Sequence, residues 1–450
     1  MDATSVRGMM DGDAARLGAV VRWNTLVLAA CTAINWAVVL LFAALGAITS
    51  AELTGQAALA GVAPFVFLVG TALGAFVMGR LMDRFGRVPV IAFAFVLGAA
   101  GGLVIFFAIG LRSAVPFFGG MALVGVTNGT VGLARAAAAD MYPPARRGRG
   151  IGYVLVGAAV GVVGGGLLFG SLLGASRGDL VTLAAPWPLA AALMALGAAV
   201  VLTIRVDPLT IGRQLRTTTM TASRSGAAGG RPVGHDAADS DPRAGVHASE
   251  TARRSLAEIF RPAGMRSALV AVIVAQLVMT SAMSLIPVYM RAHAHDLGTV
   301  SLTISSHLIG MFVLSPVLGP LTDRIGRGRA LVVGLAILAG AVLGLELGDS
   351  PLTLLPAMFL VGVGWNVSYV AATAMMGDGS APQERAGALG SADLLALLSG
   401  AAGAAVAGAL LAQIGFGPLA VSAALIALLP ALLLWRVGRG RIGWSVTPAS

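Results

Sequence analysis

The chain has 450 residues, of which 57% are hydrophobic and only 11% are charged, and its mean hydropathy is +0.88. A soluble domain carries about 25% charged residues, so this composition excludes a water-soluble globular protein and predicts one that is solvated by lipid. The net charge is +10, and all 30 basic residues are arginines. A pI near 11.2 is also typical of nucleic-acid-binding proteins, but the placement of the arginines, described below, excludes that class.

The sequence predicts an all-α membrane protein. A helix needs about 20 apolar residues to cross a bilayer, and twelve stretches meet this criterion. Six of them fall within residues 24–205 and six within residues 266–436, which predicts two six-helix bundles. The expected spans are 24–47, 59–81, 88–110, 112–138, 150–174, 181–204, 266–290, 299–321, 329–348, 351–376, 386–411 and 416–436.

The segments outside the two bundles are polar. Residues 1–23 and 437–450 form tails, and no short apolar segment with a cleavage site precedes the first span, so we expect no cleavable signal peptide. Residues 206–265 form a linker whose middle, 215–250, lacks apolar periodicity and is predicted to be disordered. An apolar face near 251–262 predicts a helix on the membrane surface.

The arginines predict the orientation of the spans. With the N-terminus in the cytoplasm, the cytoplasmic segments hold 26 arginines, and the opposite loops hold only Arg112, Arg177 and Arg291. Cytoplasmic enrichment of this size follows the positive-inside rule. Both termini are therefore predicted to be cytoplasmic, and the basic composition reflects membrane topology, with no nucleic acid as a partner.

One nine-residue pattern occurs twice at the ends of apolar runs. Residues 79–87 and 319–327 both read G-x-L-x-D-R-x-G-R, with six shared positions. The pattern resembles the loop signature of the major facilitator superfamily of transporters, found there between helices 2 and 3 and, in weaker form, between helices 8 and 9. Further residues recur 238 positions later: Asn128, Asp140, Pro144 and Arg147 return as Asn366, Asp378, Pro382 and Arg385. The resemblance implies two pseudo-symmetric halves with a substrate bound between them near the midplane.

The repeated pattern also implies a conformational gate. A carboxylate at Asp83 can sit at the N-terminus of a neighbouring helix, where free N–H groups and the macrodipole favour an anion. In the family that neighbour is helix 11, while Arg84 and Arg87 would pair with Asp140. We expect these contacts to latch the outward-facing state; alternatively, they only fix the topology and turn the chain. The expected gate residues are Gly79, Asp83, Arg84, Gly86, Arg87, Asp140, Gly319, Asp323, Arg324, Gly326, Arg327 and Asp378.

The fifth span carries a second pattern of the family. Five glycines fall at the spacing of the exporter motif G-x8-G-x3-G-P-x2-G-G: Gly148, Gly157, Gly161, Gly165 and Gly166. Glycines spaced in this way let another helix pack closely, and in the family the motif accompanies drug–proton antiport. Val162 replaces the motif's proline and removes the expected kink. Because the chain holds 61 glycines, coincidence is the alternative.

Ionisable residues inside spans are costly and mark function. Asp393, in the eleventh span, is the first candidate for proton coupling; the alternative is a hydrated carboxylate near the cytoplasmic face. His307, in the eighth span, is the second candidate; the alternative is a neutral histidine bonded to a serine or a backbone carbonyl. For Arg135, pairing with Asp140 is favoured over contact with an anionic substrate. Many proton-coupled members carry an arginine early in helix 4, where this chain has Met121.

In this architecture helices 1, 4, 7 and 10 line the central cavity. Each carries an amide near mid-depth, namely Asn35, Asn128, Gln276 and Asn366. We expect these amides to line the cavity, the alternative being hydrogen bonds between helices without ligand contact. Trp36, Trp365, Tyr369, Met279 and Met283 would supply apolar walls or packing. His293, His295 and Asp296 are expected to form a hydrated outer loop, and no metal or cofactor is expected.

The resemblance and the mostly apolar cavity imply a secondary active transporter that works by alternating access. We expect proton-coupled efflux of small amphipathic or drug-like compounds by a monomer in the bacterial plasma membrane. The first alternative is uptake or facilitated transport of a small metabolite. The remote alternative is an intramembrane enzyme that holds Mg²⁺ with clustered carboxylates. Each loop here has one Asp followed directly by Arg, which would repel the metal, so an enzyme is not expected.

Overall fold

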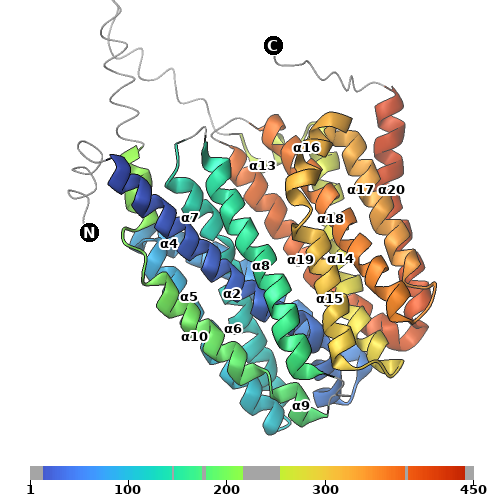
Figure 1. Ribbon diagram of the computed structural model, residues 1–450. Coiled ribbons are helices and arrows are strands. Elements are labelled where there is room, and N and C mark those ends of the chain that lie inside the picture. Colours follow the sequence, from blue (N-terminus) through green and yellow to red (C-terminus); the bar gives the residue numbers. More distant parts are fainter. Residues whose placement is uncertain (1–13, 144–145, 175–178, 216–253, 381–383, 441–450) are drawn as a thin grey trace, which may run out of the picture.

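The computed structural model describes residues 14–143, 146–174, 179–215, 254–380 and 384–440. Every regular element within these ranges is a helix (Figure 1). Ten helices are long and apolar enough to cross a membrane, and two shorter apolar helices, Leu297–Phe312 and Phe416–Leu432, bring the number to twelve. The predicted fold class is therefore confirmed. Most of the tract predicted to be disordered, 215–250, lies outside the described residues.

The chain forms two helical bundles. The N-terminal bundle contains α2 (Ala14–Thr54), a 3-10 turn (Ala57–Leu59), α3 (Val62–Leu73), a π-turn (Gly74–Met78), α4 (Gly79–Phe85), α5 (Arg87–Gly110), α6 (Ala114–Gly132), α7 (Ala134–Asp140), α8 (Arg147–Leu173), α9 (Leu180–Ala184) and α10 (Trp187–Val201). The C-terminal bundle contains α14 (Ala263–Ala292), α15 (Leu297–Phe312), α16 (Ser315–Ile325), α17 (Arg327–Gly344), α18 (Pro351–Gly379), α19 (Arg385–Ile414) and α20 (Phe416–Gly440).

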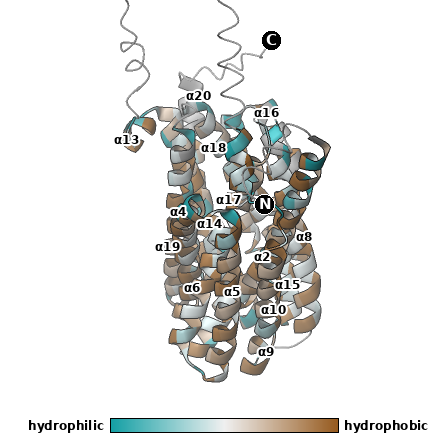
Figure 2. Ribbon diagram, turned by 90° about the vertical axis from the view of Figure 1, so that its left-hand side faces the viewer, coloured by the Kyte–Doolittle hydropathy of each residue, from teal (hydrophilic) through white to brown (hydrophobic). Residues whose placement is uncertain are grey.

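The helices run between two ends of the molecule. The start of α2 and the helix α16 lie at one end, which we call the terminal face, and α9 lies at the opposite end, the far face (Figure 1). Most residues of the helices between these ends are hydrophobic (Figure 2). Since lipid cannot hydrogen-bond the backbone, an exterior of this kind requires helices that pair their own N–H and C=O groups.

The first helix is longer than the predicted span 24–47. Its polar start packs on the segment that follows α10, where the Trp23 Nε1–H donates to the carbonyl oxygen of Thr203 (3.0 Å). The Asn24 Nδ2 donates to the carbonyl oxygen of Val206 (2.8 Å), and its Oδ1 accepts from the Arg205 N–H (3.2 Å). Apolar content alone could not reveal this extension, because the contacts that hold it join residues about 180 positions apart.

Both bundles interrupt a helix just before the repeated pattern. In the N-terminal bundle the π-turn Gly74–Met78 separates α3 from α4, and in the C-terminal bundle a turn at 313–314 separates α15 from α16. Pro316 lacks a backbone N–H and so favours a break at this position. Phe76, within the first interruption, and Phe312, directly before the second, both line the space between the bundles.

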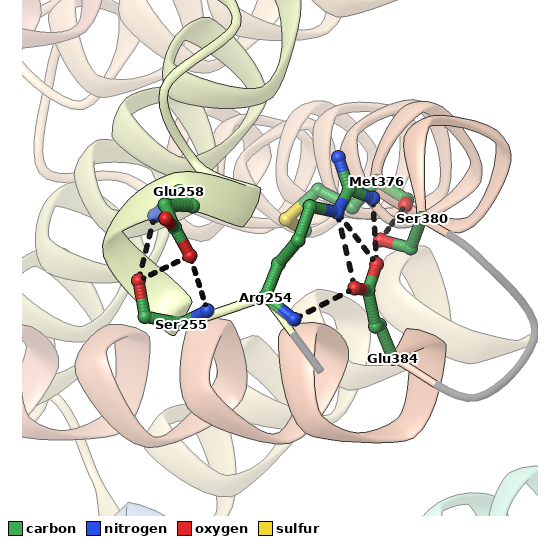
Figure 3. A network of polar contacts seen from close by, with 6 residues as sticks. All are labelled: Arg254, Ser255, Glu258, Met376, Ser380 and Glu384. Carbon is green, nitrogen blue, oxygen red and sulfur yellow. Dashed lines mark hydrogen bonds and ion pairs between the residues drawn. The ribbon is translucent and has the colours of Figure 1, made fainter. Parts of the chain in front are cut away.

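The end of the linker is fixed to the C-terminal bundle. The short helix α13 (Leu256–Ile259) begins with a capping box, in which Ser255 and Glu258 bond each other's backbone N–H groups (Figure 3). The Arg254 guanidinium donates hydrogen bonds to the carboxylate of Glu384, the residue before α19. One runs from Nε to Oε1 (3.0 Å) and another from a terminal nitrogen to Oε2 (2.6 Å). The helix predicted near 251–262 is thus present but short, and it is tied to the start of α19.

We expect Arg254→Ala to loosen α13, since the substitution removes the guanidinium contacts with the Glu384 carboxylate and leaves only the bond from the Arg254 backbone N–H to Oε1 (3.2 Å). Amide hydrogen exchange over 255–260 should then become several-fold faster, while exchange in α14 should stay unchanged. The matched control is Arg261→Ala, which removes an exposed arginine of the same segment. Equal exchange rates in the two variants would contradict the tether.

Candidate functional site

A cavity of about 810 Å³ lies between the two bundles. Its walls come from α2, α3, α4, α6, α7 and α8 on one side and from α14, α15, α18 and α19 on the other. Charged side chains among the described lining residues are Arg80, Asp83, Arg135 and Asp393. All four lie on the helix halves nearer the terminal face, so the deeper part of the cavity is uncharged.

The two bundles touch closely at the far face. A Cβ on Gly61, at the start of α3, would lie 2.0 Å from the carbonyl oxygen of Ala404 in α19. On the other side of the cavity, the Gly298 N–H donates to the carbonyl oxygen of Gly174 (3.0 Å). We call these contacts the far-face seam. At the terminal end the wall includes Asp83, whose side chain is 70% exposed, so the cavity opens toward the terminal face.

A continuous set of polar and aromatic contacts runs along the cavity wall. The Trp365 indole N–H donates to Gln276 Oε1 (2.9 Å), and the indole stacks on Tyr369 with ring centres 4.9 Å apart. The Tyr369 hydroxyl donates to Asp393 Oδ1 (2.9 Å). The other carboxylate oxygen of Asp393 lies 3.9 Å from a guanidinium nitrogen of Arg135. Because Arg135 belongs to α7 and Asp393 to α19, this ion pair joins the two bundles.

Arg135 pairs with Asp393 rather than with Asp140, its predicted partner. Residues five positions apart project from different sides of a helix, since successive residues turn by about 100°. Arg135 therefore faces the cavity, whereas Asp140 accepts from Arg87 (3.2 Å). Sequence spacing indicated an ion pair, but only the packing of the bundles could identify the partner.

The other predicted site residues divide into two groups. The cavity wall includes Trp36, Asn128, Gln276, Met279, Met283, Trp365, Asn366 and Tyr369. Asn35 lies behind the wall, almost fully buried, where its amide donates to Asn128 Oδ1 (2.9 Å) and so orients that lining side chain. His307 is also fully buried outside the described lining, and its Nδ1 lies 3.2 Å from the Met358 carbonyl oxygen.

In the N-terminal bundle the repeated pattern forms an ion-pair node. Arg87 contacts both Asp83 (3.0 Å) and Asp140 (3.2 Å). The Asp83 side chain pairs with Arg87, and its predicted contact with the start of α19 stays a prediction. The carboxylate at the start of α5 is that of Asp207, which accepts from the Val88 N–H (2.9 Å). This side chain was missed, although an Asp followed directly by Pro208 is a typical helix start.

Gly86 of the pattern has a specific backbone requirement. Its φ is +99°, in the region that favours glycine. A Cβ there would also lie 2.8 Å from a carboxylate oxygen of Asp207. The glycine thus lets the turn between α4 and α5 approach the residue that caps α5.

The C-terminal copy of the pattern forms a similar node. Arg327 pairs with Asp378 and donates to the carbonyl oxygen of Ala374 (2.9 Å). Gly326 has a φ of +86°, which matches the turn in the other bundle. The side chain of Asp323 lies outside the described residues, so its predicted role in the gate stays a prediction.

The exporter-like glycines of α8 mainly serve packing within the N-terminal bundle. A Cβ on Gly157 would lie 2.2 Å from the Ala29 carbonyl oxygen, and one on Gly161 would lie 2.1 Å from that of Ala33. These positions let α8 lie directly against α2. Gly166, in contrast, faces Ser305 of α15 in the other bundle.

The loop before α15 is held by several hydrogen bonds. His293 Nδ1 lies 2.9 Å from the Tyr289 carbonyl oxygen, and His295 Nε2 lies 2.7 Å from that of Asp349. Asp296 caps α15 by accepting from the Thr299 N–H (2.9 Å). Across the described parts of the chain, no group of three His, Cys, Asp or Glu side chains could hold a metal ion.

Comparison with known proteins places these features in a family. The sequence model of the Major Facilitator Superfamily matches residues 25–293 and 268–448. The MFS-type transporter YdeG of Bacillus subtilis (strain 168) is 30% identical over 345 residues, which cover 75% of this chain and 74% of YdeG. The riboflavin transporter RfnT of Brucella anthropi is 30% identical over 167 residues, which cover 36% of this chain and 41% of RfnT.

Solved structures show the same fold. The nucleoside transporter NupG aligns with a TM-score of 0.67 at 13% identity, over 93% of this chain and 100% of NupG. The human organic anion transporter MFSD10 aligns with a TM-score of 0.58 at 17% identity, over 93% of this chain and 99% of MFSD10. At these identities the likeness concerns the fold alone.

We expect Gly61→Ala to open the far-face seam, because the added methyl group would overlap the Ala404 carbonyl oxygen. The cavity should then become accessible from the far face. A cysteine introduced at Ala47, which lines the cavity, should react faster with an impermeant thiol reagent added on that side. The matched control is Gly119→Ala, where the added Cβ meets open space. An unchanged labelling rate in Gly61→Ala would show that the seam does not close the cavity.

Proposed function

Because the chain belongs to the Major Facilitator Superfamily of membrane transporters, we propose that it is a proton-coupled secondary transporter of small amphipathic compounds. The substrate would bind in the cavity between the bundles and cross the membrane by alternating access. The observation that carries this proposal is the ion pair of Asp393 and Arg135, which joins the two bundles at the cavity. The chain is a multi-pass membrane protein, and since its relatives are transporters we assign it no catalytic activity.

The Asp393–Arg135 pair would link proton binding to the position of the bundles. An ionised Asp393 attracts Arg135, whereas a protonated Asp393 does not. The charge of one side chain therefore changes the attraction between the bundles. Arg80 and Asp83 line the same cavity nearer the terminal face, and Tyr369 already donates to the carboxylate. A coupling free energy of only a few kcal/mol is enough to shift a population between two conformations.

We further propose that the terminal face is cytoplasmic and that the membrane is the plasma membrane. The arginine distribution supports this orientation, since the segments at the terminal face hold most of the arginines. In that orientation the cavity faces the cytoplasm. The latch through Asp83 is proposed for the opposite, outward-facing conformation. We also propose that the protein works as a monomer, because one chain supplies both walls of the cavity.

Efflux is the proposed direction. The glycine pattern of α8 and the mostly apolar wall of the cavity support it, although Val162 departs from the exporter motif. The second candidate is uptake of a metabolite. The match to RfnT favours this alternative, since that relative is a riboflavin transporter. Flux measured in each direction would separate the two candidates.

The test of coupling is Asp393→Asn, which keeps the size of the side chain but removes its charge. In inside-out vesicles given riboflavin, nucleosides and amphipathic dyes, transport driven by a pH gradient should fall at least about tenfold for whichever compound the native protein moves. Exchange of that compound without a gradient should persist. Asp349→Asn, at an exposed outer-loop carboxylate, is the matched control. If Asp393→Asn still concentrates the compound, Asp393 is not the coupling residue.

A further inference from the structure

Several aromatic rings line the uncharged part of the cavity. Trp365 and Tyr369 stack nearly parallel, with 13° between their planes, and both rings are partly exposed to the cavity. Trp36 of α2 meets Phe312 of α15 edge to face, with centres 4.5 Å apart, so both bundles contribute rings. Flat rings bind other flat rings through offset stacking and edge contacts, which a saturated ring of equal size cannot reproduce.

Most hydrogen-bond donors of the wall already donate to another group of the protein. The Trp365 N–H donates to Gln276, and the Tyr369 hydroxyl donates to Asp393. Four lining hydroxyls donate to a carbonyl of their own helix: Thr32, Thr71, Ser284 and Ser391, at 2.7–2.9 Å. The hydroxyl oxygens still hold lone pairs. The wall therefore offers mainly acceptors, which complement a ligand that carries O–H or N–H groups.

The positive charges of the described wall already have partners. Arg80 lies over the ring of Phe76 at 3.7 Å, and Arg135, near the Tyr369 hydroxyl, pairs with Asp393. An anionic ligand in the deeper cavity would lose its hydration without gaining an arginine partner. The wall thus disfavours carboxylates and phosphates.

We propose that the cavity selects an uncharged, planar aromatic ring system that stacks on Trp365 and carries a hydroxyl or N–H donor. This inference rests on the proposed transport function and narrows its substrate class. A volume of about 810 Å³ lies within the range of ligand pockets and leaves room for several fused rings.

The test compares four small probes of similar size by titration calorimetry on the full chain in detergent, with empty micelles as the blank. 2-Naphthol is planar, neutral and carries a hydroxyl donor. Decahydro-2-naphthol keeps the hydroxyl but is not planar, 2-methoxynaphthalene lacks the donor, and naphthalene-2-carboxylate is an anion. We expect 2-naphthol to bind about tenfold more tightly than the saturated alcohol and more tightly than the other two probes.

Variants of Trp365 connect this preference to the proposed surface. Trp365→Leu should reduce the ratio of the affinities for 2-naphthol and its saturated analogue to near one. Trp365→Phe keeps an aromatic face and should keep most of the preference for 2-naphthol. Trp187→Phe is the matched control, since Trp187 of α10 is fully buried outside the described cavity lining. An unchanged ratio in Trp365→Leu would overturn the assignment of the surface.

The remaining outcomes are also decisive. Equal affinity for 2-naphthol and decahydro-2-naphthol, tightest binding of the carboxylate, or no binding of 2-naphthol up to its solubility would each overturn the proposed substrate class. Calorimetry needs no gradient, so it is independent of transport. A ring preference in a protein that moves nothing in vesicles would refute transport alone, whereas transport without a ring preference would refute this inference alone.

Discussion

The contact of backbone against backbone at the far-face seam determines the shape of the whole molecule. Gly61 admits the carbonyl oxygen of Ala404 on one side of the cavity, and Gly298 bonds to Gly174 on the other. With the bundles held together there, they can separate only toward the terminal face. The cavity and its opening toward the terminal face follow from this one closure.

Hydrogen bonds between side chains hold several polar residues of the cavity wall in place. Asn35 is buried behind the wall and bonds Asn128, which faces the cavity. Gln276 is oriented by Trp365. Such bonds between helices are modest in free energy, about 1 kcal/mol each, but they hold lining side chains in a single arrangement. A preorganised wall of this kind loses little entropy when a ligand binds.

The helical architecture was accessible from the sequence because it depends on local quantities. Runs of about 20 apolar residues and the repeated pattern at 79–87 and 319–327 are each contained in a short stretch of chain. The contacts of the cavity were less accessible, because they depend on packing between distant segments. Arg135 and Asp393 are 258 positions apart, and nothing in the sequence around either residue identifies the other.

For some side chains the sequence predicted the correct helix but not the correct surroundings. Asn35 and His307 both lie in the expected spans, yet they point away from the cavity, since helix rotation is set by the neighbours against which each helix packs. Asp207 was overlooked because it lies in a segment whose composition indicated a linker. Its role arises only when the turn at Gly86 approaches it.

The two halves of the chain have equivalent turns at Gly86 and Gly326, but the aromatic rings of Trp365 and Tyr369 have no counterpart in the first half. The offset of 238 that relates Asn128 to Asn366 places Thr127 and Val131 where the second half has Trp365 and Tyr369. An aromatic ligand stacked on Trp365 would consequently stay bound to the C-terminal bundle throughout the transport cycle. The N-terminal bundle would move relative to this ligand and expose it first to one side of the membrane and then to the other.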